Sequence, residues 1–151
     1  MSAISFTSAE TVMVYIRATE DSDFYYQSGI EYARAIEGGI MDVFFDAGHI
    51  VFNFGIPPTV SIDPPFASER PAVRAAKAGG ASHLFEVELA RPVVDRLVPI
   101  RIAYVYSDII AKRVLAEGTI QYQEIEDSDL HDLLELCKSF GQNVALSALY
   151  E

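Results

Sequence analysis

Apolar and polar residues alternate along three successive runs of the chain between Ala81 and Gln123, and the runs read ASHLFEVELA, PIRIAYVYSD and KRVLAEGTIQYQ. In the first run, for example, Phe85, Val87 and Leu89 occupy alternate positions, and glutamates occupy the positions between them. Successive side chains of a strand point to opposite sides, so each run predicts a strand with one mainly apolar and one mainly polar face. We therefore expect a three-stranded meander that packs one face on a core and exposes the other to water or to a partner.

Helical periodicity marks three other segments. Apolar residues recur at spacings of three, four or seven from Asp23 to Ala47 and again from Asp129 to Leu149, which is typical of helices that bury one side. A shorter helix is predicted from Ser68 to Ala78, with Pro71 suited to its first turn. The pair Gly38-Gly39 lies inside the first helix, where each glycine costs roughly 1 kcal/mol relative to alanine. We interpret this pair either as a close-packing point against the sheet or as a break between two helices.

Two more strands are predicted, from Thr11 to Ala18 and from His49 to Phe54, so the order of elements is strand, helix, strand, helix, three strands and helix. Because most of the strands are two-faced, we expect all the helices on one face. The fold class is then α/β, a two-layer sandwich with a five-stranded mixed sheet (β-α-β-α-β-β-β-α), formed by residues 1–151 as a single domain. On the polar face we expect Arg101 to lie across from Glu86 or Glu88.

Composition and charge limit the partners. The net charge of −11 opposes binding to nucleic acid or to anionic lipid, both of which attract basic patches. No apolar run approaches the ~20 residues that span a bilayer, so we expect no direct membrane insertion. The lone Cys137 lies on an apolar helical stripe, which predicts a small core residue rather than a nucleophile. The proline-rich segment 55–66 predicts a surface connection, either a linker or a partner-binding loop.

Candidate catalytic or metal-binding residues are sparse. Asp46 lies three residues before His49, and an acid with an imidazole can transfer protons or bind a metal. The competing interpretation is a helix end followed by a strand start, with His49 in the turn. His83 and His131 are isolated in the sequence and form no zinc motif, and phosphate-loop, GxSxG, HExxH and CxxC motifs are absent from it. We therefore assign no catalytic residue, no cofactor-binding residue and no metal ligand, and we expect no cofactor.

Three segments carry a resemblance to a known family. They are AAKAGGASHLFEVELA around Ala75 to Leu89, the strand pattern of Pro99 to Asp108, and VLAEGTI at Val114 to Ile120. Together they resemble the small α/β domains of the TolB amino-terminal and curli-secretion CsgG type, and the upstream GIMDVFFDAGHIVFNF is similar to that family's helix-into-strand segment. The family's glycine-containing hairpin turn is replaced here by residues 108–112. The resemblance implies a bacterial periplasmic or envelope setting and carries over no catalytic residue.

These observations leave three hypotheses. The first is a non-enzymatic, periplasmic envelope domain that binds a protein partner or forms a homo-oligomer. It assumes an export signal outside this sequence, because Ser2 to Thr11 lacks the pattern of a signal peptide. The second is a small-molecule-binding or enzymatic α/β domain, with a site at the carboxyl ends of the parallel strands near 19–23 and 55–58, joined by Asp46 and His49. The third is a cytoplasmic accessory protein.

Overall fold

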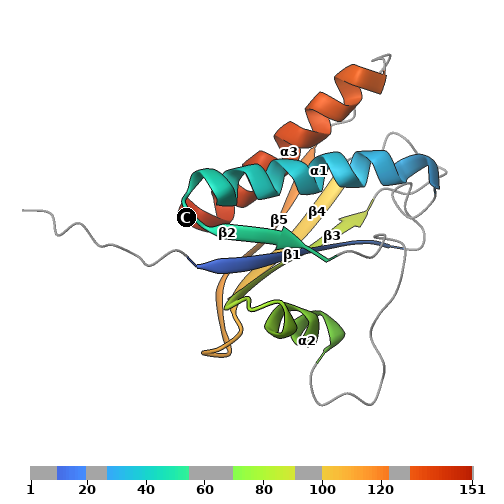
Figure 1. Cartoon of the computed structure of the whole chain (residues 1–151). Helices are drawn as coiled ribbons and strands as arrows, with labels where there is room; N and C mark the ends of the chain where they lie inside the picture. The colour runs from blue at the N-terminus through green and yellow to red at the C-terminus, as the bar shows by residue number, and fades with distance from the viewer. Residues whose placement is uncertain (1–9, 20–26, 55–69, 91–99, 123–129, 151) are drawn as a thin grey trace, which may run out of the picture.

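The computed structural model describes residues 10–19, 27–54, 70–90, 100–122 and 130–150. Within these residues, three helices accompany a five-stranded mixed sheet, and the elements follow the predicted order (Figure 1). The α/β class and the sheet are therefore confirmed. The elements are β1 (Thr11–Ala18), α1 (Gln27–Asp46), β2 (Ile50–Asn53), α2 (Pro71–Ala78), β3 (His83–Ala90), β4 (Ile100–Asp108), β5 (Arg113–Tyr122) and α3 (Leu130–Tyr150).

The element bounds differ from the predicted ranges mainly at their ends. β2 is shorter than expected because His49 belongs to the turn that ends α1, where its backbone N–H donates to the carbonyl of Phe44. Gly48 adopts φ of 92° in that turn, which a residue with a side chain rarely does. The segments expected to begin the first two helices, at 23–26 and 68–69, and the proline-rich segment 55–66 lie outside the described residues.

β1 is an interior strand of the sheet, whose order is β2-β1-β3-β4-β5. It runs parallel to β2, with Thr11 opposite Ile50, and parallel to β3, with Val12 opposite His83. β3, β4 and β5 then form the antiparallel meander that the alternation predicted. The amino ends of the parallel strands and the hairpin between β4 and β5 consequently share one end of the sheet.

α1 and α3 cover one face of the sheet and enclose the main core (Figure 1). The side chains of β1 that point to this face are Val12, Val14 and Ile16, and none is more than 3% exposed. The predicted helical stripes are confirmed here, since Phe44 of α1 and Cys137 of α3 are both buried in the same cluster. Burying each large apolar side chain contributes about 1.5–3 kcal/mol.

Two glycines allow α1 and α3 to cross closely. A Cβ placed on Gly39 would lie 2.0 Å from the carbonyl oxygen of Lys138, and one placed on Gly141 would lie 2.0 Å from that of Ile36. The helix is continuous through Gly38 and Gly39, so the predicted close-packing role is right for Gly39, but its neighbour is α3 rather than the sheet. Gly38 itself meets nothing within 4 Å.

α2 packs on the opposite face of the sheet from α1 and α3 (Figure 1). Ala72 and Ala76 of α2 contact a second buried cluster that includes Met13, Tyr15 and Leu84, the residues of β1 and β3 that point away from the main core. The expectation that all the helices share one face is therefore wrong for α2. The reason is that β1 is apolar on both sides, which is typical of a strand buried on both faces.

Candidate functional site

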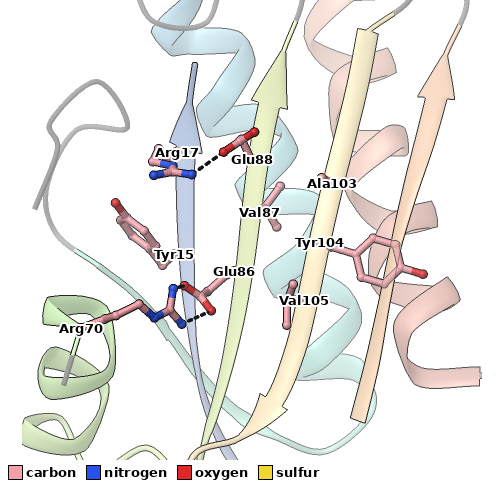
Figure 2. Close-up of a pocket in the computed structure, with 9 residues that line it drawn as sticks. All are labelled: Tyr15, Arg17, Arg70, Glu86, Val87, Glu88, Ala103, Tyr104 and Val105. Atoms are coloured by element: carbon pink, nitrogen blue, oxygen red, sulfur yellow. Dashed lines mark hydrogen bonds and ion pairs between the residues drawn. The ribbon is translucent and has the colours of Figure 1, made fainter. Parts of the chain in front are cut away.

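Among the described residues, α2 covers part of the second face of the sheet, and a groove lies beside it. The groove has a volume of about 310 Å³ and lies beside α2, over β1, β3 and β4 (Figure 2). Its lining includes Tyr15, Arg17, Arg70, Glu86, Glu88 and Val105. A volume of this size accommodates a few side chains of a protein partner or a small ligand.

Two ion pairs cross the floor of the groove (Figure 2). Arg70, at the start of α2, donates two hydrogen bonds to the carboxylate of Glu86, with nitrogen–oxygen distances of 2.5 and 2.6 Å. Arg17 of β1 pairs with Glu88 of β3. The side chain of Arg70 is 57% exposed, so its pair contributes at most ~1 kcal/mol to folding. The fork geometry still fixes the orientation of both charged groups.

Glu86 pairs with Arg70 and Glu88 pairs with Arg17, whereas the alternation of the strands suggested Arg101 as the partner. The register places Arg101 opposite Ala90 and Gln121, and the expected pairing of Arg101 with Glu86 or Glu88 is wrong. Alternation assigns a residue to a face of the sheet but does not fix its position along the strand.

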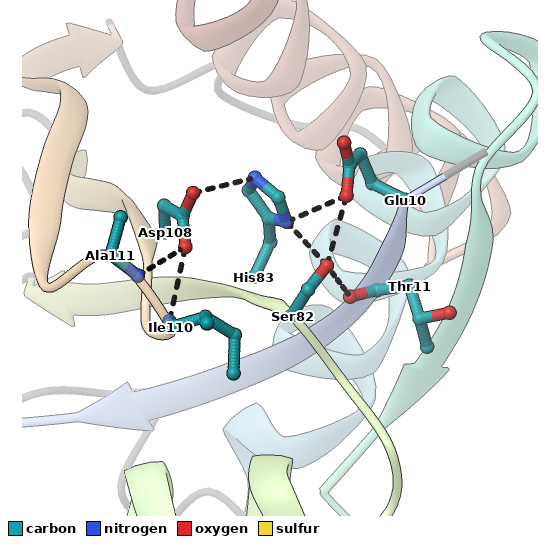
Figure 3. A network of polar contacts seen from close by, with 7 residues as sticks. All are labelled: Glu10, Thr11, Ser82, His83, Asp108, Ile110 and Ala111. Atoms are coloured by element: carbon teal, nitrogen blue, oxygen red, sulfur yellow. Dashed lines mark hydrogen bonds and ion pairs between the residues drawn. The ribbon is translucent and has the colours of Figure 1, made fainter. Parts of the chain in front are cut away.

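A second group of polar residues gathers around His83, at the amino ends of β1 and β3 (Figure 3). The side chain of His83 is 9% exposed, and Ser82 Oγ lies 2.7 Å from its Nδ1. On the same side Glu10 Oε2 lies 3.4 Å from Nδ1, and on the other side Asp108 Oδ2 lies 4.0 Å from Nε2. The group joins the segment before β1, the start of β3 and the end of β4.

The hydrogen bonds of this group favour a structural role. Ser82 donates its single hydroxyl proton to Glu10 at 3.0 Å, which leaves its oxygen to accept from Nδ1–H of His83. In that arrangement Nδ1 cannot act as the base that activates Ser82, as a serine nucleophile would require. Backbone bonds from Ser82 N–H to the Thr11 carbonyl and from Ile109 N–H to the Ser82 carbonyl join the same segments.

Electrostatics in this group follow from burial and from backbone donors. Hydrogen bonds from the N–H groups of Ala111 and Ile110, together with nearby positive groups, hold the pKa of Asp108 below its ordinary value; the Ala111 N–H has the largest effect. Burial, assisted by the charges of Glu10 and Asp108, raises the pKa of Tyr106 to about 12. Asp108 is therefore an anion and Tyr106 a neutral phenol near neutral pH.

The Asp46 to His49 turn does not join the site that was predicted for it. Asp46 ends α1 and is exposed, whereas His49 packs its ring against Phe44 at a centroid distance of 5.8 Å. The turn lies at the amino end of β2, because the helix returns the chain to that end of the sheet. It is therefore at the opposite end from the carboxyl ends of β1 and β2, and the connecting segments 20–26 and 55–69 lie outside the described residues.

Sequence reasoning found neither the groove nor the group around His83. His83 is far from Glu10 in the sequence, since Glu10 lies 72 positions from Ser82, the residue next to His83. His131 lies in the first turn of α3, as expected.

Across the described ranges, no three His, Cys, Asp or Glu side chains are placed to hold a metal ion. Of the helices in those ranges, none has both the length and the apolar character needed to cross a bilayer.

Comparisons with known proteins establish the fold. No protein-family model and no curated protein sequence matches this chain. The PelC dodecamer from Paraburkholderia phytofirmans superposes with a TM-score of 0.56 at 11% identity, over 93% of this chain and 89% of the PelC chain. Lipoprotein GNA1162 from Neisseria meningitidis superposes with a TM-score of 0.53 at 12% identity, over 91% of this chain and 99% of that protein. The fold is thus one that a bacterial lipoprotein uses.

The expected relationship to TolB and CsgG is not specifically supported. TolB from Acinetobacter baumannii superposes with a TM-score of 0.48 at 8% identity, over 94% of this chain and 28% of TolB. A likeness at that level carries no argument about relationship, so membership of that family stays a prediction.

Proposed function

We propose that this chain is a single non-enzymatic domain of the bacterial envelope, which acts in the periplasm by binding a protein partner or by self-association. The observation that carries the proposal is the groove on the second sheet face, which holds apolar and charged side chains together. Partner surfaces commonly combine an apolar centre with fixed charges around it. The likeness to lipoprotein GNA1162 supports the envelope setting, and the likeness to the PelC dodecamer supports self-association.

The charge of the chain supports a protein partner over nucleic acid or anionic lipid. The net charge is −11, with 22 acidic and 11 basic residues. Nucleic acid and anionic lipid bind to basic patches on proteins. In the groove itself each arginine is paired with a glutamate. Charged groups on a protein partner can form ion pairs with these arginines and glutamates. Because the geometry of the two pairs is fixed, such binding is specific.

Site-specific crosslinking tests the proposal. A photoreactive amino acid replaces Val105, which is half-buried in the groove, in a protein directed to the periplasm of living bacteria. The matched control carries the same group at Glu31, which is exposed on α1. We expect a discrete protein adduct or a crosslinked homo-oligomer from position 105 and not from position 31.

A second variant links the adduct to the groove. Ala103→Arg places a long charged side chain among the lining residues and should abolish the adduct at position 105 while leaving the circular dichroism spectrum unchanged. Equal crosslinking at positions 105 and 31, together with a monomer at every concentration in sedimentation velocity, would refute the proposal.

A further inference from the structure

Exposed apolar side chains are concentrated in two short segments of this protein. Five of the seven exposed large hydrophobic residues among the described ranges lie in or directly beside the turn from α1 to β2 or the hairpin from β4 to β5. We name the first group the turn patch, which consists of Phe45, Asp46 and Ile50. We name the second the hairpin patch, which consists of Ile110, Lys112, Arg113, Val114 and Leu115.

The exposure of these side chains is large. Phe45 is 70% exposed and Ile50 is 61% exposed in the turn patch, and Ile110 is 66% exposed in the hairpin patch. Single apolar residues scattered over a surface are normal, but apolar residues gathered with charged neighbours are typical of interaction sites.

The two patches lie at the same end of the sheet but on opposite edges. The turn patch adjoins β2 and the hairpin patch adjoins β5, and these strands are the two edges of the sheet. Four strand spacings of about 4.8 Å separate the edges, roughly 20 Å in all. Neither patch can therefore cover the other within one molecule.

Both patches are held in fixed conformations. In the hairpin, the carboxylate of Asp108 accepts hydrogen bonds from the N–H groups of Ile110 and Ala111, at 3.0 and 2.9 Å, and Ile109 is buried in the cluster beneath α2. In the turn, Gly48 N–H donates to the carbonyl of Phe45. Binding surfaces that are already ordered lose less conformational entropy on association.

The charges of the two patches are complementary. The turn patch carries the exposed carboxylate of Asp46. The hairpin patch carries the exposed cations of Lys112 and Arg113, and the neighbouring Asp108 carboxylate offsets one of them, so this patch keeps a net positive charge. Contact between two hairpin patches, or between two turn patches, brings like charges together. Contact between a hairpin patch and a turn patch brings opposite charges together, and such matching selects one partner over another.

We propose that a second copy of this chain is the occupant, with the turn patch of one copy bound to the hairpin patch of the next. This inference rests on the self-association branch of the proposed function and adds the two surfaces to it. Because the surfaces differ, the contact repeats head to tail, and the product is a closed ring or an open filament rather than a two-fold dimer.

Two complementary variants test the head-to-tail arrangement. Phe45→Ser with Ile50→Ser removes the apolar groups of the turn patch, and Ile110→Ser with Leu115→Ser removes those of the hairpin patch. In sedimentation velocity over a concentration series, each variant alone should self-associate at least about tenfold more weakly than the unaltered chain. An equimolar mixture of the two variants should form a capped heterodimer, since one intact turn patch still meets one intact hairpin patch.

Leu146→Ser is the matched control, because Leu146 is an exposed leucine on α3 that belongs to neither patch; its association should equal that of the unaltered chain. All substituted side chains are exposed, and equal urea midpoints check that folding is unchanged. Charge reversal gives a second, independent test: Asp46→Lys alone should weaken association, and mixing it with Lys112→Asp should restore it.

The outcomes separate this inference from the proposed function. If the unaltered chain associates but the mixture of serine variants yields no heterodimer, the head-to-tail contact is wrong while self-association stands. If one serine variant associates like the unaltered chain, its patch is not part of the contact. A chain that stays monomeric at every concentration overturns this inference, and groove crosslinking to another protein would still support the proposed function.

Discussion

Alanine at Gly39 and alanine at Gly38 should change stability in opposite directions, although the two residues are neighbours in one helix. Both substitutions gain helix propensity, worth up to about 1 kcal/mol per residue. At Gly38 nothing lies within 4 Å of the added methyl group, so Gly38→Ala should stabilise the protein by about 0.5–1 kcal/mol.

At Gly39 the added methyl group meets the backbone of α3. Its distance from the carbonyl oxygen of Lys138 would be 2.0 Å, whereas real Cβ contacts are essentially never below 3.0 Å, so one helix must move by about 1 Å. The obstacle is backbone, which cannot rotate away as a side chain can. A gap of that size also forfeits a quarter to a half of each dispersion contact along the crossing. Overpacking of this kind costs about 1–3 kcal/mol, which exceeds the gain in propensity.

Urea unfolding followed by circular dichroism measures both changes under the same conditions. We expect Gly38→Ala to raise the unfolding midpoint and Gly39→Ala to lower it, with equal slopes, and the two variants should differ by the overpacking cost of about 1–3 kcal/mol. Gly141→Ala should resemble Gly39→Ala, since its methyl group would lie 2.0 Å from the carbonyl oxygen of Ile36. A Gly39→Ala variant as stable as Gly38→Ala would refute the close crossing of α1 and α3.

Three further predictions concern other parts of the structure. A double-mutant cycle on Arg70→Ala and Glu86→Ala should give a coupling free energy below ~1 kcal/mol that falls in high salt, because the pair is partly exposed; a large, salt-independent coupling would contradict this. The pKa of Tyr106 is raised from 10.0 to about 12, so its contribution to stability is fully present below pH 10 and is lost as the pH rises through about 12. In urea unfolding across that range, Tyr106→Phe should lose less stability than the unaltered chain, and parallel losses would count against the raised pKa. Cys137 is 5% exposed, so a thiol reagent should label it slowly without denaturant and much faster in urea; fast labelling of the native protein would show that the thiol is accessible.

The sequence predicted the elements of this fold because each carries its own periodicity. The three meander strands and the stripes of α1 and α3 are local patterns, and the structure confirms them. The second helical layer was also visible in principle: β1 reads Val-Met-Val-Tyr-Ile, and Met13 and Tyr15 are apolar residues on its second side. Such a run is typical of a strand that is covered on both faces.

The candidate sites could not be predicted in the same way, because they depend on register and on contacts between distant segments. Asp108 meets His83 only because the antiparallel register sets them opposite each other. The groove lies beside α2, over β1, β3 and β4. Arg70, the residue directly before α2, donates to Glu86 of β3. A single sequence gives the face of each residue but not these positions along the strands.

The interior place of β1 in the sheet has a consequence for biosynthesis. β1 is synthesised before β3, its partner on one edge, and the hydrogen-bonded residues Thr11 and Ser82 are 71 positions apart. At the usual 5–20 residues per second, about 4–14 s of translation separate the two strands. During that interval the edge of β1 that β3 will cover is unsatisfied, and it is accessible to chaperones and to other nascent chains. Production of this protein is therefore most vulnerable to aggregation between the synthesis of β1 and that of β3.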